Sequence, residues 1–274
     1  MTVAFSRPLD LGWDGHLLLL HWTEDERRYG LASWVQRGLD RGDKVIYTET
    51  AAPDSGDGLL VILGQHGVDV GSASEQGLLE ILPLDEFYPP QGQITLVEAA
   101  LAAGYPSVRM SAQGGAPLTW LSQQAYDEAE RTLEQLCQSH PVSALCQIKQ
   151  SAIADVNMAE SAALHHRGIR ESQVQTAQVG GTLVLAGDVD VSNTLVVSSA
   201  LEAATTYASN VFTLDLTHLE FLDVTGCRSL VRGTDAFRDN GGLLEVMAPR
   251  GIRHVLHVLG FEELSQVRFL DFDS

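Results

Sequence analysis

The chain has 274 residues, 45% of them hydrophobic, and a formal net charge of −19 at pH 7. This length predicts about two domains, each large enough to bury a core without metal or disulfide staples. The apolar content excludes a disordered chain. The acidic charge argues against binding to nucleic acid or to an anionic membrane surface, because both require clustered lysine and arginine.

No segment has the pattern of a membrane span. The most apolar run, residues 17–20, is far shorter than the roughly 20 residues that a bilayer requires. The N-terminal residues lack a charged region followed by an apolar stretch, so we expect no secretory signal. Three cysteines without a Cys-x-x-Cys pair are typical of reduced thiols: Cys137, Cys146 and Cys227. We therefore expect a cytoplasmic protein.

The first half of the chain alternates short strands with helices. Residues 16–21 are continuously apolar between two histidines, which is typical of a strand buried on both faces of a parallel sheet. Thr23 and Glu26 then predict the capping box of a helix that continues to Asp40 and ends at Gly42. Further strands are expected at 44–48, 79–82, 108–112 and 142–148, and further helices at 58–66, 94–103, 122–139 and 151–165. This alternation predicts βαβ units and a parallel sheet.

A polar, weakly patterned segment follows, and we interpret residues 168–175 as a linker between domains at 10–167 and 176–274. The second domain is expected to begin with a hairpin that turns at Gly180 and Gly181. Its remaining elements are predicted as helices at 193–208, 223–239 and 251–259 and strands at 211–216, 243–247 and 267–270. The sequence therefore predicts two α/β domains.

Three segments of the second domain carry the most specific signal. They are Leu-Asp-Leu at 214–216, Phe-Leu-Asp-Val-Thr-Gly at 221–226 and Asn-Gly-Gly at 240–242. With 187–190 and 258–261, they resemble the STAS domain, the fold of anti-sigma-factor antagonists. The resemblance implies a partner, an anti-sigma factor that is also a Ser/Thr kinase. It also implies that Thr225 stands where the antagonists carry a phosphorylated serine, with Val224 in place of the preceding serine.

The start of this helix also has a physical interpretation of its own. Asp223 is a natural N-cap, which places Thr225 in the first turn, beside the positive end of the helix dipole. Arg228 and Arg232 follow Thr225 at spacings of 3 and 4 residues and so share its face. We hypothesise that a phosphate on Thr225 pairs with these arginines and blocks a docking surface. The alternative is a helix-start threonine beside two solvated arginines.

The predicted partner-binding residues are Asp188, Asp190, Asp223, Thr225, Arg228 and Arg232.

The first domain resembles the MEDS domain, a sensory module of methanogens and methylotrophs. The matching segments are 15–21, 38–48, 85–88 with Gly92, 103–110 and 144–147. The resemblance implies a RecA/KaiC-like parallel sheet and a sensory function. The chain departs from the family at Gln113, near which a Glu is common, and at Ile148, near which a Tyr is common.

A parallel sheet places its ligand crevice beyond the carboxyl ends of the strands. Aromatic and polar residues follow those ends, which suits a small organic ligand. The predicted pocket residues are His21, Trp22, Glu49, Ser111, Gln113 and Trp120. The alternative is that these aromatic residues are ordinary core.

Enzyme chemistry and metal binding find weak support in the sequence. A RecA-like nucleotidase needs a Gly-rich phosphate loop after its first strand, but the segment from Trp22 to Glu26 is acidic and lacks glycine. His254 with His257 and Cys137 with His140 lack further ligands, so we expect no metal and no cofactor. The sequence predicts a signalling regulator that acts by binding. The alternative is a small-molecule sensor whose STAS domain mediates self-association as a homo-oligomer.

Overall fold

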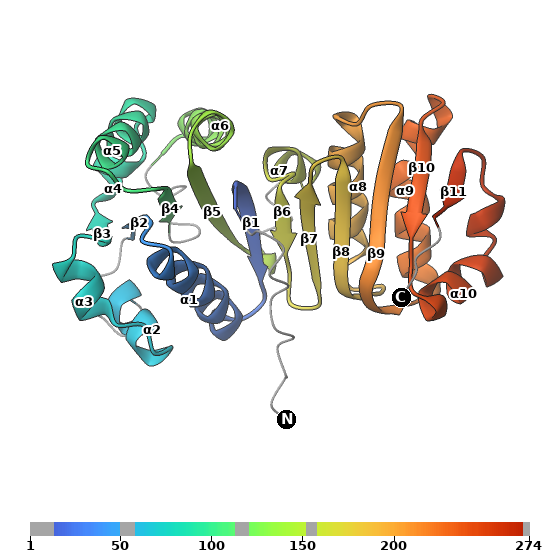
Figure 1. The fold of residues 1–274 in the computed structure, drawn as a ribbon, viewed down its shortest axis with the longest axis horizontal. Coiled ribbons are helices and arrows are strands. Elements are labelled where there is room, and N and C mark those ends of the chain that lie inside the picture. The colour runs from blue at the N-terminus through green and yellow to red at the C-terminus, as the bar shows by residue number, and fades with distance from the viewer. Residues whose placement is uncertain (1–13, 50–57, 113–120, 152–157, 271–274) are drawn as a thin grey trace. The chain divides into compact units, whose positions relative to one another are not determined.

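The computed structural model describes residues 14–49, 58–112, 121–151 and 158–270. The chain divides into two compact units, of which one comprises Asp14–Ile153 and the other contains Ala154–Ser274. We call them the N-terminal and C-terminal units. In Figure 1 the first is coloured from blue to green and the second mainly from yellow to red.

The N-terminal unit is a parallel α/β sheet. Its described strands are β1 (His16–His21), β2 (Lys44–Thr48), β3 (Leu79–Leu82), β4 (Val108–Ala112) and β5 (Val142–Lys149). Its described helices are α1 (Glu24–Asp40), α2 (Leu59–Gln65), α3 (Val70–Glu75), α4 (Leu84–Phe87), α5 (Pro90–Ala102) and α6 (Gln123–Ser139). The strand order is β1-β5-β4-β2-β3, and every neighbouring pair is parallel.

Side chains cap the first turns of α1, where the cap was predicted, and of α6. Thr23 and Glu26 form the reciprocal capping box of α1, and Ser122 caps α6 through the amide of Ala125. Helices α5 and α6 cover one face of the sheet, where they bury Ile46, Met110 and Ala144. The alternation expected from the apolar runs is therefore confirmed, and the short helices α3 and α4 are additions that the sequence pattern did not indicate.

A buried ion pair lies within the N-terminal sheet. The side chain of Arg109 is fully buried, and its Nε donates to Asp43 at 2.8 Å. A second bond joins Arg109 to Asp14, and the guanidinium stacks on the Trp34 ring, with 5.0 Å between its carbon and the ring centroid. A buried charge needs such partners, because desolvation of an unpaired ion is very unfavourable.

The C-terminal unit has a mixed sheet. Its described strands are β6 (Gly168–Arg170), β7 (Val174–Val179), β8 (Thr182–Val189), β9 (Val211–Leu222), β10 (Leu243–Met247) and β11 (Val267–Phe269). Its described helices are α7 (Met158–Leu164), α8 (Thr194–Thr206), α9 (Val224–Asp239), α10 (Arg250–Val258) and the 3-10 helix Phe261–Glu263. In the order β6-β7-β8-β9-β10-β11, the first two pairs are antiparallel and the last three are parallel.

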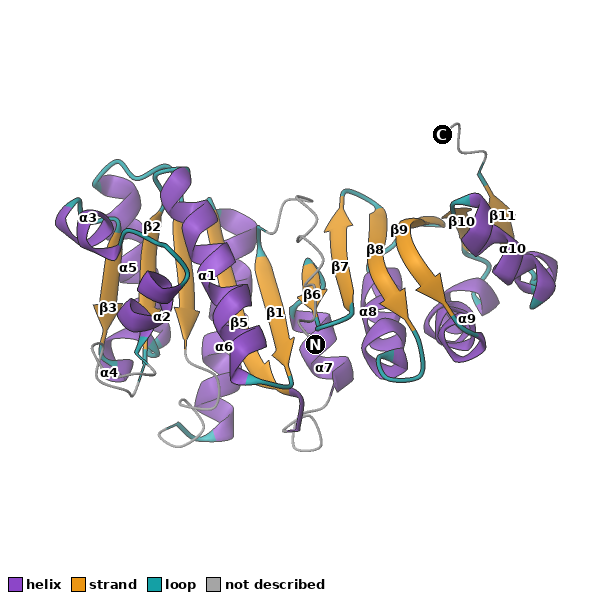
Figure 2. Ribbon diagram, turned by 90° about the horizontal axis from the view of Figure 1, so that it is seen from below, coloured by secondary structure: helices purple, strands orange, loops and turns teal. Residues whose placement is uncertain are grey.

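Helix α8 packs against α9, and both follow parallel strands of this sheet (Figure 2). The contact is close because α9 carries Gly233, where a Cβ would lie 2.8 Å from the carbonyl oxygen of Ser198 on α8. The apolar core beneath includes Leu185, Leu214 and Leu230. The close packing fixes the first turns of the two helices next to each other.

Residues 168–175, interpreted as a linker, contribute to strands β6 and β7 instead of forming a free connection. The Glu171 amide donates to the Val174 carbonyl, which closes the turn between the two strands. Helix α7, which was placed in the first domain, packs against α8 of the C-terminal unit. Ile169 and Val174 are buried in the two strands, but the polar residues between them hid this pattern in the sequence.

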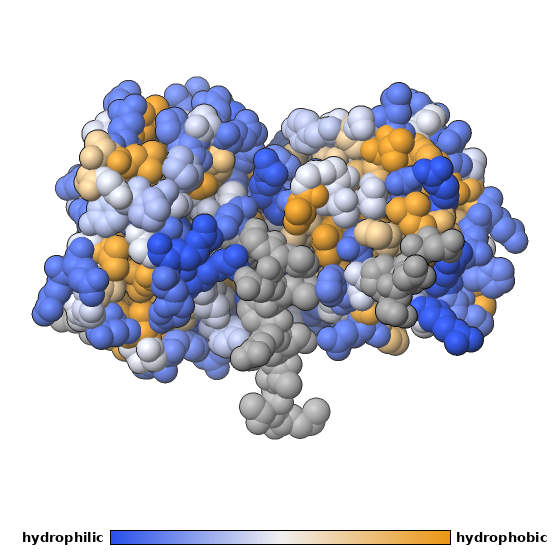
Figure 3. Space-filling view, in the orientation of Figure 1, coloured by the Kyte–Doolittle hydropathy of each residue, from blue (hydrophilic) through white to orange (hydrophobic). Residues whose placement is uncertain are grey.

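The surface drawn in Figure 3 is mainly hydrophilic, with smaller apolar areas among the charged residues. Within the described parts of the chain, none of the helices combines the length and hydropathy needed to cross a bilayer.

Candidate functional site

The start of α9 is held by the side chain of its N-cap residue, Asp223, and by contacts with Val189 at the end of β8. The Asp223 carboxylate accepts a hydrogen bond from the Gly226 amide at 2.6 Å, as the N-cap prediction requires. The Asp223 amide in turn donates to the Val189 carbonyl at 3.2 Å. At Gly226, a Cβ would lie 2.5 Å from that same carbonyl oxygen, so this position has no room for a side chain. These contacts hold Thr225 at the end of β8.

A pocket of about 260 Å³ lies between the first turns of α8 and α9. It is lined by Thr194, Leu195 and Ser198 from α8 and by Thr225, Arg228, Ser229 and Arg232 from α9. Thr225 is partly buried, while Arg228 and Arg232 are exposed. The structure therefore places Thr225, Arg228 and Arg232, which helical spacing put on one face, in the lining of one pocket.

Exposed apolar side chains lie at the starts of the two helices that line this pocket. Val191 and Leu195 flank the start of α8 at 69% and 55% exposure, and Phe221 and Val224 flank the start of α9 at 51% and 49%. Parallel pairing of β8 with β9 brings both helix starts to the same edge of the sheet. Apolar side chains next to polar and charged groups are typical of a protein–protein docking surface.

Asp188 is near the end of β8 and Asp190 lies in the turn between β8 and α8, and both are partly buried. Asn193 connects them, because its Nδ2 donates to the Asp188 carbonyl at 2.9 Å and its Oδ1 accepts from the Asp190 amide at 3.1 Å. The Asp190 carboxylate accepts from the backbone amide and the hydroxyl of Ser192. Asp190 thus orders the turn, and Asp188 lies opposite Phe221 in the strand register.

The predicted small-molecule pocket of the N-terminal unit is described only in part, since Gln113 and Trp120 lie outside the described residues. His21 is buried, and its Nδ1 has no hydrogen-bond partner among the residues that the structure describes. Trp22 is half exposed. The Glu49 carboxylate accepts from the Leu59 amide and so caps α2, which gives that residue a structural task.

A hydrogen-bonded chain at the carboxyl ends of β4 and β5 involves the predicted residue Ser111. Gln147 donates to the Ser111 hydroxyl at 3.0 Å and accepts from Arg27 at 3.1 Å. Arg27 also pairs with Glu24. Gln147 stands at a strand end in the sequence, but the contact with Arg27 spans 120 positions and had no signal in the pattern.

The turn where a nucleotidase would carry its phosphate loop is filled by a carboxylate of this chain. Glu26 accepts hydrogen bonds from the Trp22 amide at 2.7 Å and from the Thr23 amide at 3.4 Å. Free amides at the start of a helix are what a phosphate would bind. Glu26 therefore occupies the position of an anion at the end of β1.

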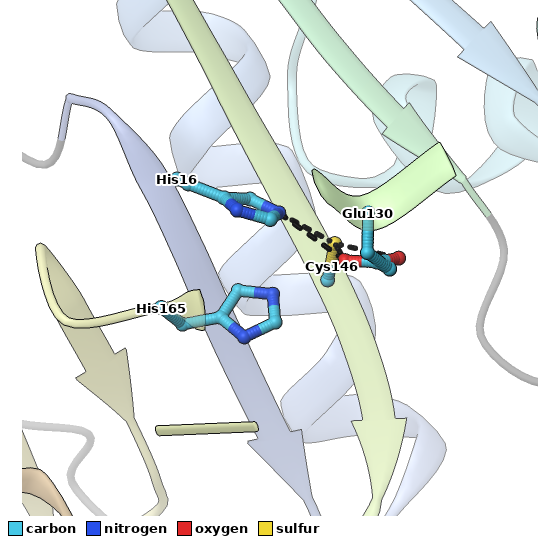
Figure 4. Close-up of side chains that lie close together, drawn as sticks. All are labelled: His16, Glu130, Cys146 and His165. Carbon is cyan, nitrogen blue, oxygen red and sulfur yellow. Dashed lines mark hydrogen bonds and ion pairs between the residues drawn. The ribbon is translucent and has the colours of Figure 1, made fainter. Parts of the chain in front are cut away.

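One cluster in the N-terminal unit was missed by sequence reasoning. The buried imidazole of His16 on β1 lies against Glu130 of α6, and Cys146 of β5 lies beside it (Figure 4). The other ring nitrogen of His16 lies 3.2 Å from Glu134 of α6. Burial acts to lower the pKa of His16, but the two carboxylates outweigh it and raise the pKa to about 9. Burial and the charge of Glu130 raise the pKa of the Cys146 thiol. A glutamate at a buried position of α6 was the available signal.

Two family models match the chain. The MEDS model, described as the methanogen/methylotroph, DcmR sensory domain, covers residues 15–166, and a model described as "Mlab, STAS domain" covers residues 172–270. No curated protein matches the chain.

Solved structures give similarity at low identity. A KaiC-like protein of Pyrococcus horikoshii is 13% identical, over 63% of this chain and 78% of that one, with a TM-score of 0.42. An uncharacterized protein of the same organism, in complex with an unknown peptide, is 14% identical over 61% and 84%, with a TM-score of 0.43. The flagellar accessory protein FlaH of Methanocaldococcus jannaschii is 7% identical over 62% and 74%, with a TM-score of 0.41.

The first of the two family models spans more than half of the chain, and its bounds and those of the second agree with the two resemblances found in the sequence. The chain therefore belongs to the MEDS family of sensory proteins and carries a STAS domain after its MEDS domain.

Proposed function

We propose that this protein is an anti-sigma factor antagonist whose STAS domain captures an anti-sigma factor of the Ser/Thr kinase type. A sensory domain joined to a STAS domain is the organisation of a signalling regulator. The observation that carries the finer proposal is the pocket between α8 and α9, where Thr225 lies with Arg228 and Arg232. The partner docks on this pocket and on the exposed apolar side chains at the starts of the two helices.

Phosphorylation of Thr225 is the switch in this proposal. A phosphate adds up to about two negative charges and three acceptor oxygens. Arg228 and Arg232, in the same pocket, supply charge-assisted hydrogen bonds to it. The modified side chain then fills the pocket and changes the charge of the docking surface, so the anti-sigma factor is released.

The first experiment incubates the full chain with ATP and a kinase-type anti-sigma factor from the same genome. We expect one phosphate, located at Thr225 by mass spectrometry. Thr225→Ala abolishes labelling, whereas Thr206→Ala, an exposed threonine at the other end of α8, leaves it unchanged. Labelling that persists in Thr225→Ala would refute the assignment.

The second experiment measures capture of the same anti-sigma factor without ATP. We expect Thr225→Glu to weaken binding and Thr206→Glu to leave it unchanged. Equal binding by the Thr225→Glu variant and the unmodified chain would contradict the switch.

The signal that controls the switch enters through the MEDS domain in this proposal. The buried His21 at the carboxyl end of β1, whose Nδ1 meets no partner within the described parts of the chain, is a polar group that a small organic ligand can bind. Native mass spectrometry of the purified chain tests for such a ligand, and His21→Phe is expected to remove it. A ligand retained at the same occupancy in His21→Phe would exclude this site.

The exposed apolar residues around the pocket also fit a second candidate, in which the STAS domain mediates self-association. Size-exclusion chromatography with light scattering distinguishes the two. A discrete oligomer that fails to bind the kinase, and that Leu195→Asp dissociates, would favour self-association over capture of an anti-sigma factor.

A further inference from the structure

Three donor atoms of the N-terminal unit converge from three different elements. They are Nε2 of His16 on β1, a carboxylate oxygen of Glu130 on α6 and Sγ of Cys146 on β5. Nε2 lies 3.3 Å from Oε2 of Glu130 and 3.4 Å from Sγ, and Sγ lies 3.2 Å from Oε2. Figure 4 shows these side chains pointing toward one another.

The triangle of donors has the dimensions of one face of a tetrahedral zinc site. Bonds of about 2.0 Å to nitrogen and oxygen and about 2.3 Å to sulfur place two ligand atoms about 3.3 to 3.6 Å apart at the tetrahedral angle. The three observed separations lie within a few tenths of an ångström of that range. An ion can therefore bind with small movements of side chains that are already oriented.

The other nitrogen of His16 is held as in metal sites. Its Nδ1 lies 3.2 Å from Oε2 of Glu134, one helical turn from Glu130 on the same face of α6. A histidine that ligates a metal usually donates its second N–H to a carboxylate, which fixes the tautomer and directs the free lone pair at the ion. Glu134 is thus in the position of a residue that orients His16.

The chemistry of the donor set selects the class of ion. Thiolate and imidazole favour borderline transition metals such as Zn²⁺ and disfavour Mg²⁺ and Ca²⁺, which prefer oxygen ligands. Binding releases one proton from Nε2 of His16 and one from the Cys146 thiol. The charges of Glu130 and of the thiolate then balance the two charges of the ion, so binding leaves the net charge of this buried cluster unchanged.

We propose that His16, Glu130 and Cys146 form a binding site for one Zn²⁺-type transition-metal ion in the MEDS domain, with Glu134 as a positioning residue. The site is independent of the phosphorylation proposed for Thr225, because every residue in it belongs to the N-terminal unit.

The test uses the full chain, stripped with a chelator and titrated with Co²⁺ as a spectroscopic substitute for Zn²⁺. We expect one ion per chain, a thiolate-to-cobalt charge-transfer band, intense visible bands of a tetrahedral ion, and loss of all of them on addition of Zn²⁺. Cobalt binding without a thiolate band, or no binding near equimolar concentration, would overturn the proposal whether or not any variant folds.

Variants then assign the ligands. Cys146→Ser is expected to raise the Kd for Zn²⁺ by more than about 100-fold and Glu134→Gln by about 10- to 100-fold, since the second acts through His16. Cys227→Ser, the same substitution at a buried thiol of the C-terminal unit, leaves the Kd unchanged. Circular dichroism of the stripped proteins verifies the fold, and an unchanged Kd in folded Cys146→Ser would refute the site.

Discussion

Replacement of Gly226 by alanine tests how the docking surface is held in place. In the structure, the added Cβ would lie 2.5 Å from the Val189 carbonyl oxygen and 2.9 Å from its Cγ1. Ordinary carbon–oxygen contacts are about 3.3 Å or longer, so the start of α9 must move away from β8 by most of an ångström. That movement strains the hydrogen bond from the Asp223 amide to the Val189 carbonyl, now 3.2 Å.

The magnitude follows from opposing effects. Overpacking of a close contact destabilises by about 1–3 kcal/mol, and a weakened backbone hydrogen bond adds up to about 1 kcal/mol. Alanine in place of glycine within a helix stabilises the folded state by about 0.5–1 kcal/mol, which offsets part of this loss. We therefore expect Gly226→Ala to destabilise the C-terminal unit by about 1–3 kcal/mol.

Gly251 provides the matched control. It is the second residue of α10, and a Cβ there would meet no described atom within 4 Å beyond its chain neighbours and its own helix backbone, so Gly251→Ala gains helix propensity without a clash. Its expected effect is a stabilisation of up to about 1 kcal/mol.

Hydrogen exchange measured by mass spectrometry on peptides from α9 and β9 reports the stability of this unit separately from the N-terminal unit. Equal protection of these peptides from exchange in Gly226→Ala and Gly251→Ala would mean that the close approach of α9 to β8 is not rigid. The explanation given for how the docking surface is held in place would then be wrong.

Three further predictions concern the N-cap of α9, the buried Arg109 and the two arginines of the pocket. Asp223→Ala removes the N-cap of α9 and is expected to lower the free energy of unfolding by about 1 kcal/mol, which a urea titration measures; Asp223→Asn retains most of it. Asp43→Ala leaves the buried Arg109 without one of its carboxylates and is expected to lower the free energy of unfolding by about 3–5 kcal/mol. In thermal melts, the double variant Asp43→Ala with Arg109→Met is expected to recover much of this loss. Arg228 and Arg232 are exposed, so replacing either by alanine is expected to change the free energy of unfolding by less than about 0.5 kcal/mol. The same variants are expected to weaken the salt dependence of partner binding. A larger loss of stability would contradict the exposure of these arginines.

The sequence predicts those features of the fold that depend on residues close to one another in the chain. The capping box of Thr23 and Glu26 and the N-cap of Asp223 are interactions over three residues, and both form as expected. The gathering of Thr225, Arg228 and Arg232 follows from helical periodicity alone. The other wall of that pocket, which comes from Leu195 and Ser198 of α8, depends on helix packing that spacing does not encode.

The histidine, glutamate and cysteine cluster shows why long-range sites are not predicted this way. His16 and Cys146 are 130 positions apart, and they meet because β1 pairs with β5 in a register that sets Ala144 beside His16. Strands β1 and β5 are neighbours in this sheet although they are the first and the last strands of the N-terminal unit, so the strand order had to be known before their side chains could be paired. Only Glu130 carried a local signal, as a carboxylate among the buried positions of an amphipathic helix. A buried carboxylate requires a partner of opposite charge. The position of Glu130 in α6 therefore demands a proton donor or a cation that the local sequence does not supply. In the structure that donor is His16 on β1.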